Sequence, residues 1–485
     1  MTKTGMDEKI VVGLDIGSTK VCAVAGRLIR NNKEQETLEV LGVGETNLTD
    51  GVAKGSVVNV NNTVNAIRRA IHEASNQSNL DIHLVNVSFS GSHVTSVKSS
   101  GSITRSSSGD EVQVEDIDHL LNDMYRTSIP ADKEIIHVLP MDFVVDTETN
   151  INQPVGRNGV KLGADFQLIT AQANAARNIR KCITRNNLAQ DTMMLSALAS
   201  GLAVLTDEEK YAGVALVDIG GGTTEMAIYY RNVLRHVAVF PWAGNSLTSD
   251  IQAGCKILPN QAELLKKKFG NANPGEYNLN EVVAVPGLSN RKPKDVLLKN
   301  VAVIIEDRLR EIAALVQAEI IRSGYDGKLL GGIVLTGGSA LIPGVEQIFG
   351  RVTGIEEVRV GYPEHLEPNG RADLVGDPAH ATAVGLVWAG YKTIDNRISF
   401  ITDPNRLFKE DENQPIHTHN GTTGGHGSTN GHTTTGGYGT SHGGRVTQKV
   451  PDKTPDPEPS KDEGGLIGWL RKLTRPIRGN ETDPY

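Results

Sequence analysis

The chain has 485 residues, of which 38% are hydrophobic and 22% charged, and its formal net charge is −8. This length accommodates about three domains, and the negative charge argues against a general nucleic-acid-binding surface. The three cysteines, Cys22, Cys182 and Cys255, have no metal-ligand spacing and are expected to be buried free thiols. We expect no signal peptide, because residues 1–9 are polar, and no membrane-spanning helix, because no apolar run reaches ~20 residues.

Residues 1–90 are predicted to form a first α/β lobe. Strands over 10–29 and 38–43 are followed by a helix over 60–75, whose apolar residues recur at helical spacing, and by a strand over 85–90. The first two strands meet at a turn that carries no bulky side chain. The candidate binding residues of this turn are Asp15, Gly17, Ser18, Thr19 and Lys20.

Residues 91–167 have a different pattern of short segments and are predicted to form a small inserted α+β domain. Short β-rich segments over 135–139 and 143–145 accompany one short helix over 114–125.

A second lobe is predicted over 168–401. Helices are expected over 171–187 and 196–205, and a second glycine-rich hairpin follows them. Its candidate residues are Asp218, Gly220, Gly221, Gly222, Thr223 and Thr224. Residues 245–300, with a helix over 261–269, are predicted to form a subdomain on this lobe. A long amphipathic helix over 301–323 precedes a third glycine turn at Gly337, Gly338 and Ser339, and a closing helix is expected over 378–390.

The first two glycine turns have the same sequence pattern and would offer the same groups to a ligand. Each follows a strand that ends in Asp-Ile-Gly, and small or hydroxyl residues come next. Glycine lets backbone N–H groups approach an anion closely, and the two carboxylates, Asp15 and Asp218, suit a hydrated divalent cation. The pattern therefore predicts two loops that grip one polyphosphate. The plain alternative is that these glycines only connect strands.

Residues 402–463 contain too few hydrophobic residues to fold and are predicted to be a disordered linker. Five histidines in it could bind metal, although their irregular spacing favours a spacer. Residues 464–479 are predicted to form a basic amphipathic helix that binds an anionic membrane surface. Docking on the protein's own body or in a partner's groove would suit the same pattern. The helix residues concerned are Leu466, Ile467, Trp469, Leu470, Arg471, Lys472, Leu473, Arg475, Ile477 and Arg478.

With its three glycine turns, the chain resembles the actin/Hsp70/sugar-kinase superfamily, in which two ribonuclease-H-like lobes face each other across an ATP cleft. Together with the linker and basic tail, it resembles the FtsA family of bacterial cell-division proteins over about residues 10–390. Segments that carry the likeness include His137-Val138-Leu139-Pro140 and Ala243-Gly244-Asn245-Ser246-Leu247. The inserted segment over 91–167 fits the domain that distinguishes FtsA from actin and MreB.

This resemblance implies an ATP-binding protein that polymerises on the cytoplasmic face of the inner membrane, at the division site. It implies that the protein tethers FtsZ through that protein's C-terminal peptide and recruits later division proteins. Glu263 and Lys266 would lie beside the ribose and adenine, the third glycine turn would leave room for the base, and Asp15 and Asp218 would position Mg²⁺ through water. Arg308 and Glu311 match family positions near the FtsZ groove, although an i,i+3 ion pair on a solvated helix face explains them equally well.

The sequence departs from its actin-like relatives in one respect. Those relatives place a Gln or Glu before the second hairpin to orient the attacking water, whereas residues 195–201 here offer only hydroxyls and methyls. We therefore expect at most slow ATP hydrolysis. Two other readings stay open at this point, a small-molecule kinase on the same fold and an ATPase of the pilus-assembly type, although neither accounts for the basic tail.

Overall fold

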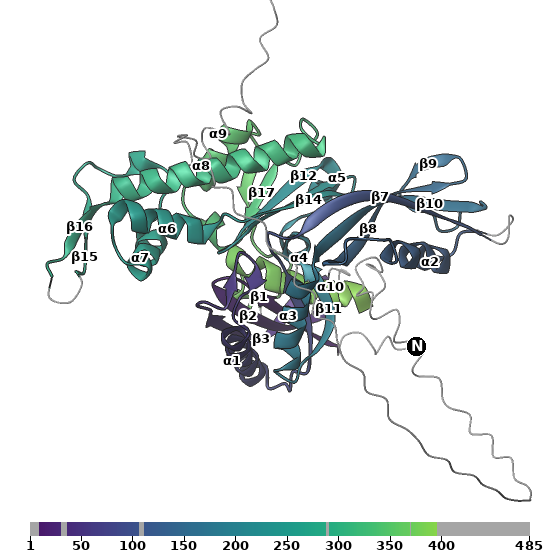
Figure 1. Ribbon diagram of the computed structural model, residues 1–485, viewed down its shortest axis with the longest axis horizontal. Coiled ribbons are helices and arrows are strands. Elements are labelled where there is room, and N and C mark those ends of the chain that lie inside the picture. Colours follow the sequence, from purple (N-terminus) through teal and green to yellow (C-terminus); the bar gives the residue numbers. More distant parts are fainter. Residues whose placement is uncertain (1–8, 31–35, 106–110, 288–290, 369, 395–485) are drawn as a thin grey trace, which may run out of the picture. The chain divides into compact units, whose positions relative to one another are not determined.

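The computed structural model describes residues 9–30, 36–105, 111–287, 291–368 and 370–394, drawn in colour in Figure 1. The predicted linker (402–463) and the predicted amphipathic helix (464–479) lie outside these residues. The described residues contain three large sheets, each with its own hydrophobic cluster or a share in one.

The first sheet has the strand order β11-β6-β1-β2-β3. Strands β1 (Ile10–Ile16), β2 (Lys20–Arg30) and β3 (Glu36–Asn47) are antiparallel, while β6 (Leu84–Phe89) and β11 (Ala189–Leu195) continue in parallel. Helix α1 (Val60–Ser78) lies so close to β3 that a Cβ at Gly44 would stand 1.9 Å from the Ala70 carbonyl oxygen. This contact explains why the strand carries glycine there.

The second sheet repeats this pattern with the order β14-β13-β12-β17-β18. Its antiparallel strands are β12 (Val214–Ile219), β13 (Thr224–Tyr230) and β14 (Val233–Phe240), and β17 (Ile333–Thr336) and β18 (Val358–Val360) are parallel. Two sheets built in the same strand order agree with the internal repetition that the two hairpins indicated.

Helices and a small hairpin accompany the second sheet (Figure 1). The long helix α8 buries Val301, Ile305, Leu309, Ile312 and Val316, which recur at helical spacing. The elements are α5 (Asp207–Ala212), α6 (Gly244–Cys255), α7 (Pro259–Phe269), η1 (Pro274–Glu276), β15 (Val282–Val285), β16 (Lys294–Leu297), α8 (Leu298–Ser323), η2 (Gly338–Leu341) and α9 (Val345–Thr353).

The third sheet forms a separate antiparallel unit, with the order β7-β10-β8-β9 and helix α2 (Val114–Tyr125) beside it. Its strands are β7 (Thr95–Thr104), β8 (Lys133–Val145), β9 (Glu148–Ile151) and β10 (Lys161–Gln172). The other elements in the part of the chain that the structure describes are β4 (Val52–Ala53), β5 (Ser56–Val57), α3 (Ala173–Thr184), α4 (Ser196–Val204), η3 (Ala372–Leu374), η4 (Pro378–His380) and α10 (Ala381–Ile394).

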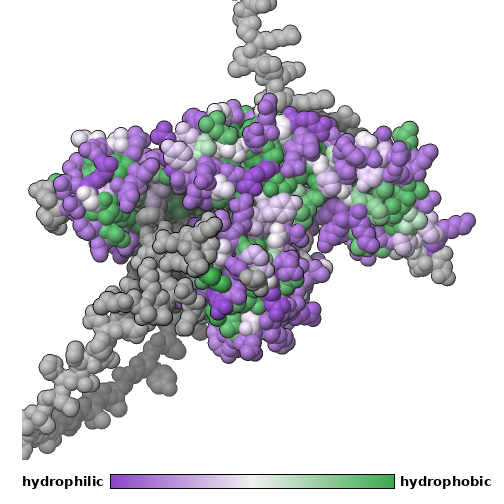
Figure 2. Space-filling model, turned by 180° about the vertical axis from the view of Figure 1, so that it is seen from behind, coloured by the Kyte–Doolittle hydropathy of each residue, from purple (hydrophilic) through white to green (hydrophobic). Residues whose placement is uncertain are grey.

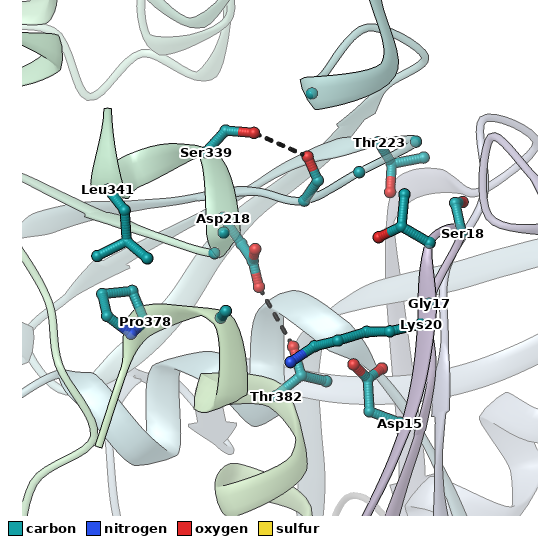
Figure 3. Close-up of a pocket in the computed structure, with 18 of the residues that line it drawn as sticks. Asp15, Gly17, Ser18, Lys20, Asp218, Thr223, Ser339, Leu341, Pro378 and Thr382 are labelled. Atoms are coloured by element: carbon teal, nitrogen blue, oxygen red, sulfur yellow. Dashed lines mark hydrogen bonds between the residues drawn. The ribbon is translucent and has the colours of Figure 1, made fainter. Parts of the chain in front are cut away.

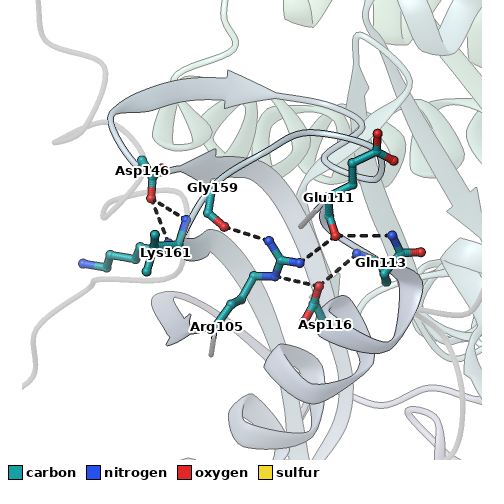
Figure 4. Close-up of polar contacts among 8 residues, drawn as sticks. Arg105, Glu111, Gln113, Asp116, Asp146, Gly159 and Lys161 are labelled. Carbon is teal, nitrogen blue, oxygen red and sulfur yellow. Dashed lines mark hydrogen bonds and ion pairs between the residues drawn. The ribbon is translucent and has the colours of Figure 1, made fainter. Parts of the chain in front are cut away.

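Arg105 organises one end of this third unit (Figure 4). Its guanidinium donates to Asp116 at 2.8 Å and to the carbonyl oxygens of Gly159 at 2.7 Å and Glu111 at 2.6 Å. Asp116 also accepts the Gln113 N–H at 2.9 Å, which fixes the first turn of α2. One nearly buried cation therefore joins the start of α2 to the distant segment at Gly159.

Two of the expected lobe boundaries are wrong. The second lobe was expected from residue 168, but β10 continues the third sheet to Gln172, and β11 belongs to the first sheet. The closing helix was assigned to the second lobe, yet α10 packs against β1, where a Cβ at Gly13 would meet the Ala383 carbonyl oxygen at 2.4 Å. The physical reason is that the inserted domain interrupts the first sheet. Its last parallel strand, β11, follows that domain in the chain, and α10, which covers the sheet, comes from the end of the described residues.

Candidate functional site

A cavity of about 470 Å³ opens where the first and second sheets present their hairpin turns to each other. This volume is within the usual range for a small-molecule site. Figure 3 shows that it is lined by the β1–β2 turn, the β12–β13 turn and the segments that follow β17 and precede α10.

The two hairpin turns are closed by equivalent backbone hydrogen bonds. The Gly17 N–H donates to the Lys20 carbonyl oxygen at 3.0 Å, and the Gly220 N–H donates to the Thr223 carbonyl oxygen at 3.0 Å. Each turn is closed by its own backbone, so a short segment without bulky side chains is left at the edge of the cavity. This segment is the kind that approaches an anion closely.

The turns come so close that glycine is required between them. A Cβ at Gly221 would stand 2.6 Å from Cγ2 of Thr19, and one at Gly222 would stand 2.2 Å from Oγ of Ser18. A larger residue at either position would force these neighbouring side chains, or the turns that carry them, to shift. The Gly-Gly pair is therefore explained by contact between the lobes as well as by turn conformation.

Asp15 and Asp218 lie at the base of the cavity, one from each lobe. Burial raises the pKa of Asp15, and burial followed by the charge of Asp15 raises the pKa of Asp218 to about 6. Asp218 accepts hydrogen bonds from Ser200 at 2.5 Å and Thr382 at 3.3 Å. Two carboxylates with raised pKa values, of which Asp218 also feels the charge of Asp15, are suited to a divalent cation, which would neutralise them.

The third glycine turn closes the cavity behind Asp218. Gly337 has φ +83°, and a Cβ there would stand 2.3 Å from Oδ1 of Asp218. Ser339 donates to the Gly220 carbonyl oxygen at 3.2 Å and so connects the third turn to the second. Gly338, by contrast, has room for a Cβ, whose nearest neighbour would be Ala379 at 3.7 Å.

Glu263 and Lys266 lie on α7, one turn apart, at the same cavity. The Lys266 ammonium contacts Glu263 at 2.7 Å and donates to the Gly244 carbonyl oxygen at 3.0 Å. The cavity thus brings together fifteen of the sixteen residues that the sequence predicted as cofactor contacts. The exception is Thr224, whose buried hydroxyl donates to the Trp242 carbonyl oxygen at 2.7 Å.

Glu225 lines the cavity and was missed by the sequence analysis. It is opposite Asp218 in the β12–β13 register, so both side chains lie on one face of the sheet. One carboxylate oxygen accepts the Ala197 N–H at 3.1 Å, and the other accepts the Ser90 hydroxyl. Burial, and then the charge of Asp218, raises the pKa of Glu225 to about 8.

A signal for Glu225 was available in the sequence. It is a charged residue just after the turn of the second hairpin, at the second position of the mainly apolar strand β13. The expectation of slow hydrolysis rested on residues 195–201, which contain no Gln or Glu. In the fold an acidic side chain nevertheless reaches this segment, because the Glu225 carboxylate of β13 accepts the Ala197 N–H in the first turn of α4.

Arg308 and Glu311 lie on α8 and do not line the cavity. Arg308 contacts Glu311 and forms a two-pronged pair with Asp250 of α6, at 2.6 and 3.1 Å. These contacts raise the pKa of Arg308, with the Asp250 hydrogen bond as the largest cause. The ion pair expected on this helix face is present, and it extends to a second helix.

No helix among the described residues is both long enough and apolar enough to cross a membrane. Figure 2 shows that one face of the described surface is mainly hydrophilic, with its hydrophobic residues in separate groups. The ten residues predicted to contact a membrane, from Leu466 to Arg478, lie outside the described residues.

Comparison with known proteins decides the family. The model of "Cell division protein FtsA" matches residues 215–385, and that of "SHS2 domain inserted in FTSA" matches residues 91–170. The cell division protein FtsA of Pseudomonas aeruginosa is 36% identical over 408 residues, which cover 84% of this chain and 95% of that protein. The chain belongs to the FtsA family. The FtsA of Escherichia coli K12 is 34% identical over 391 residues, 79% of this chain and 91% of that protein.

The fold has a wider distribution than the family. A chain of the "PilM-PilN type IV pilus biogenesis complex" superposes with a TM-score of 0.56 at 15% identity, covering 79% of this chain and 98% of that chain. A likeness at this identity concerns the fold alone. The FtsA-family protein therefore has the actin-like α/β architecture with an inserted domain, and its role is in cell division.

Proposed function

We propose that this FtsA-family protein binds ATP with Mg²⁺ in the cavity between its two lobes. The observation that carries the proposal is that two glycine hairpins closed by the same backbone hydrogen bond, one from each lobe, face each other with an aspartate beside each. In this arrangement backbone N–H groups would meet phosphate oxygens from both sides. Asp15 and Asp218 would hold the hydrated cation, which neutralises phosphate charge when bound.

Lys20 and the third glycine turn would complete the binding of the nucleotide. Lys20 lines the cavity beside Asp15 and supplies a cation for phosphate oxygens. Gly338 presents no side chain to the cavity and so leaves room for a flat base, and Glu263 and Lys266 offer polar groups to a sugar. Nucleotide bound to both hairpins would hold the lobes together, and this is how it would favour a polymer-competent form.

ATP turnover is proposed to be slow. The Glu225 carboxylate is placed to orient a water, yet both of its oxygens already accept hydrogen bonds, from Ala197 and Ser90. Because burial raises the pKa of Glu225 to about 8, this group is mostly protonated at neutral pH and is a poor base for abstracting a proton from water. The bound nucleotide therefore acts chiefly as a structural ligand in this proposal.

Beyond nucleotide binding, we propose that the protein polymerises at the cytoplasmic face of the membrane, binds the FtsZ C-terminal peptide and recruits later division proteins. Membership of the FtsA family supports this role. Residues 466–478 would anchor each subunit weakly, and a polymer would present many anchors at once. Avidity then makes a single short basic helix sufficient.

The peptide-binding role of Arg308 can be separated from its role in packing. Asp250→Asn removes the ion pair between α6 and α8 and leaves the Arg308 cation in place, whereas Arg308→Ala removes the ion pair and the cation. If Arg308 binds FtsZ, Arg308→Ala weakens binding of the FtsZ C-terminal peptide at least about tenfold, while Asp250→Asn leaves it within about threefold. Fluorescence anisotropy with a labelled peptide measures both. Equal losses in the two variants would show that Arg308 acts only through helix packing.

A further inference from the structure

At the edge of the cavity proposed for nucleotide, which Glu45 and His380 help to line, three metal-ligating side chains of different kinds converge. The thiol of Cys22, a carboxylate oxygen of Glu45 and a ring nitrogen of His380 all lie within 4.8 Å of one another. They come from β2, β3 and η4, so they are brought together only by the fold. Among the described residues, this is the one such group with a mixed sulfur, oxygen and nitrogen donor set.

The strand register explains how the group forms. Asp15 is opposite Cys22 in the β1–β2 pair, and Cys22 is opposite Glu45 in the β2–β3 pair. Directly opposite residues project to the same face of a sheet, so these three side chains form one row across three strands. His380 covers this row from the segment before α10, and its Nε2 lies 2.8 Å from Glu45.

We propose that Cys22, Glu45 and His380 form a binding site for a zinc-class divalent cation. A tetrahedral zinc site holds its ligand atoms roughly 3.3–3.8 Å apart, given metal–ligand distances of about 2.0–2.3 Å. The 4.8 Å limit on the present separations requires only side-chain adjustments of about 1 Å. Three protein ligands leave a fourth position for water or for neighbouring Asp15, and a thiolate with an imidazole selects zinc over magnesium.

The charged groups around the site define what the metal must displace. The Lys20 ammonium lies 2.6 Å from Glu45 and competes with a cation for the same carboxylate. The Nδ1 atom of His380 is buried without a hydrogen-bond partner, whereas its Nε2 contacts Glu45, and a metal would have to replace that contact. Metal binding would therefore exchange the Lys20–Glu45 pair for a link between the first sheet and the segment that leads into α10.

Cobalt(II) is the probe, because a cysteine ligand gives it a thiolate charge-transfer absorption. The full-length chain is titrated under reducing conditions in a variant whose five linker histidines are replaced by glutamine, so that they cannot bind the metal. The changes are His417→Gln, His419→Gln, His426→Gln, His432→Gln and His442→Gln. We expect one equivalent of cobalt to produce the band and zinc to abolish it by displacement.

Matched variants assign the ligands. Cys22→Ala abolishes the band, and Cys182→Ala, at another buried free thiol, leaves it unchanged. Glu45→Gln and His380→Gln, at partly exposed positions that tolerate change better, each weaken binding by roughly tenfold or more. Lys20→Met strengthens binding, because it removes the competing cation. Absence of the band in the parent protein, or a band that survives in Cys22→Ala, overturns the proposal.

Discussion

Glu225→Gln should change how the stability of the nucleotide-free protein depends on pH. In the folded protein burial raises the pKa of Glu225 from 4.5 to about 8. The folded state therefore holds a proton that the unfolded state releases between these two values. Because the folded state binds more protons in this window, the free energy of unfolding falls as pH rises from about 4.5 to about 8.

The size of the effect follows from the pKa. A pKa raised from 4.5 to about 8 corresponds to an upper limit of roughly 4–5 kcal/mol, at about 1.4 kcal/mol per unit. Glutamine has the shape of the protonated acid and can still accept the Ala197 N–H and donate to the Ser90 hydroxyl. The variant should match the wild type near pH 5 and exceed its stability by a few kcal/mol near pH 8.5.

Urea unfolding at the two pH values, without nucleotide or divalent cation, measures the difference. The control is Glu356→Gln at an exposed site, which should shift stability by less than about 0.5 kcal/mol at either pH. A stability difference between Glu225→Gln and wild type that stays constant with pH would refute the reasoning. A stability difference that becomes larger as the pH falls would also refute it.

Two further predictions concern the third glycine turn and the inserted domain. Gly337→Ala should reduce MgATP affinity at least about tenfold, because its Cβ would clash with Asp218. Gly338→Ala, where a Cβ has room, should change that affinity by less than about threefold. Isothermal titration calorimetry compares the two variants, and equal affinities would contradict the geometry. Asp142→Asn should cost roughly 2–3 kcal/mol of stability, because it leaves the nearly buried Arg235 guanidinium without its carboxylate. Glu148→Gln, at an exposed ion pair of the same domain, should cost less than about 1 kcal/mol, and a similar loss in both variants by urea unfolding would count against the role given to burial.

Local features of the fold could be predicted from the sequence. The helix expected over 114–125 is α2 (Val114–Tyr125), and the one expected over 301–323 is contained in α8. Both have apolar residues at helical spacing, which is a short-range property of the chain. The glycine hairpins were equally accessible, because an Asp-Ile-Gly strand end and the turn after it involve only neighbouring residues.

Long-range pairing could not be predicted in the same way. Strand β11 pairs in parallel with β6 after an intervening domain, and nothing within its seven residues records that partner. Glu45 and His380 are separated by 335 positions and meet only because α10 returns to the first lobe. Glu225 was missed for a related reason, since its contact with Ala197 joins two segments that the sequence shows separately.

The most direct test of the account is liposome co-sedimentation of FtsZ. Vesicles that contain anionic lipid are mixed with FtsZ and MgATP, and either the full-length protein or a chain that ends at residue 463 is added. The account predicts that FtsZ pellets with the full-length protein and stays in solution with the shortened one. FtsZ that stays in solution while the full-length protein pellets would contradict the adaptor role. Equal pelleting of the two chains would contradict the membrane anchor.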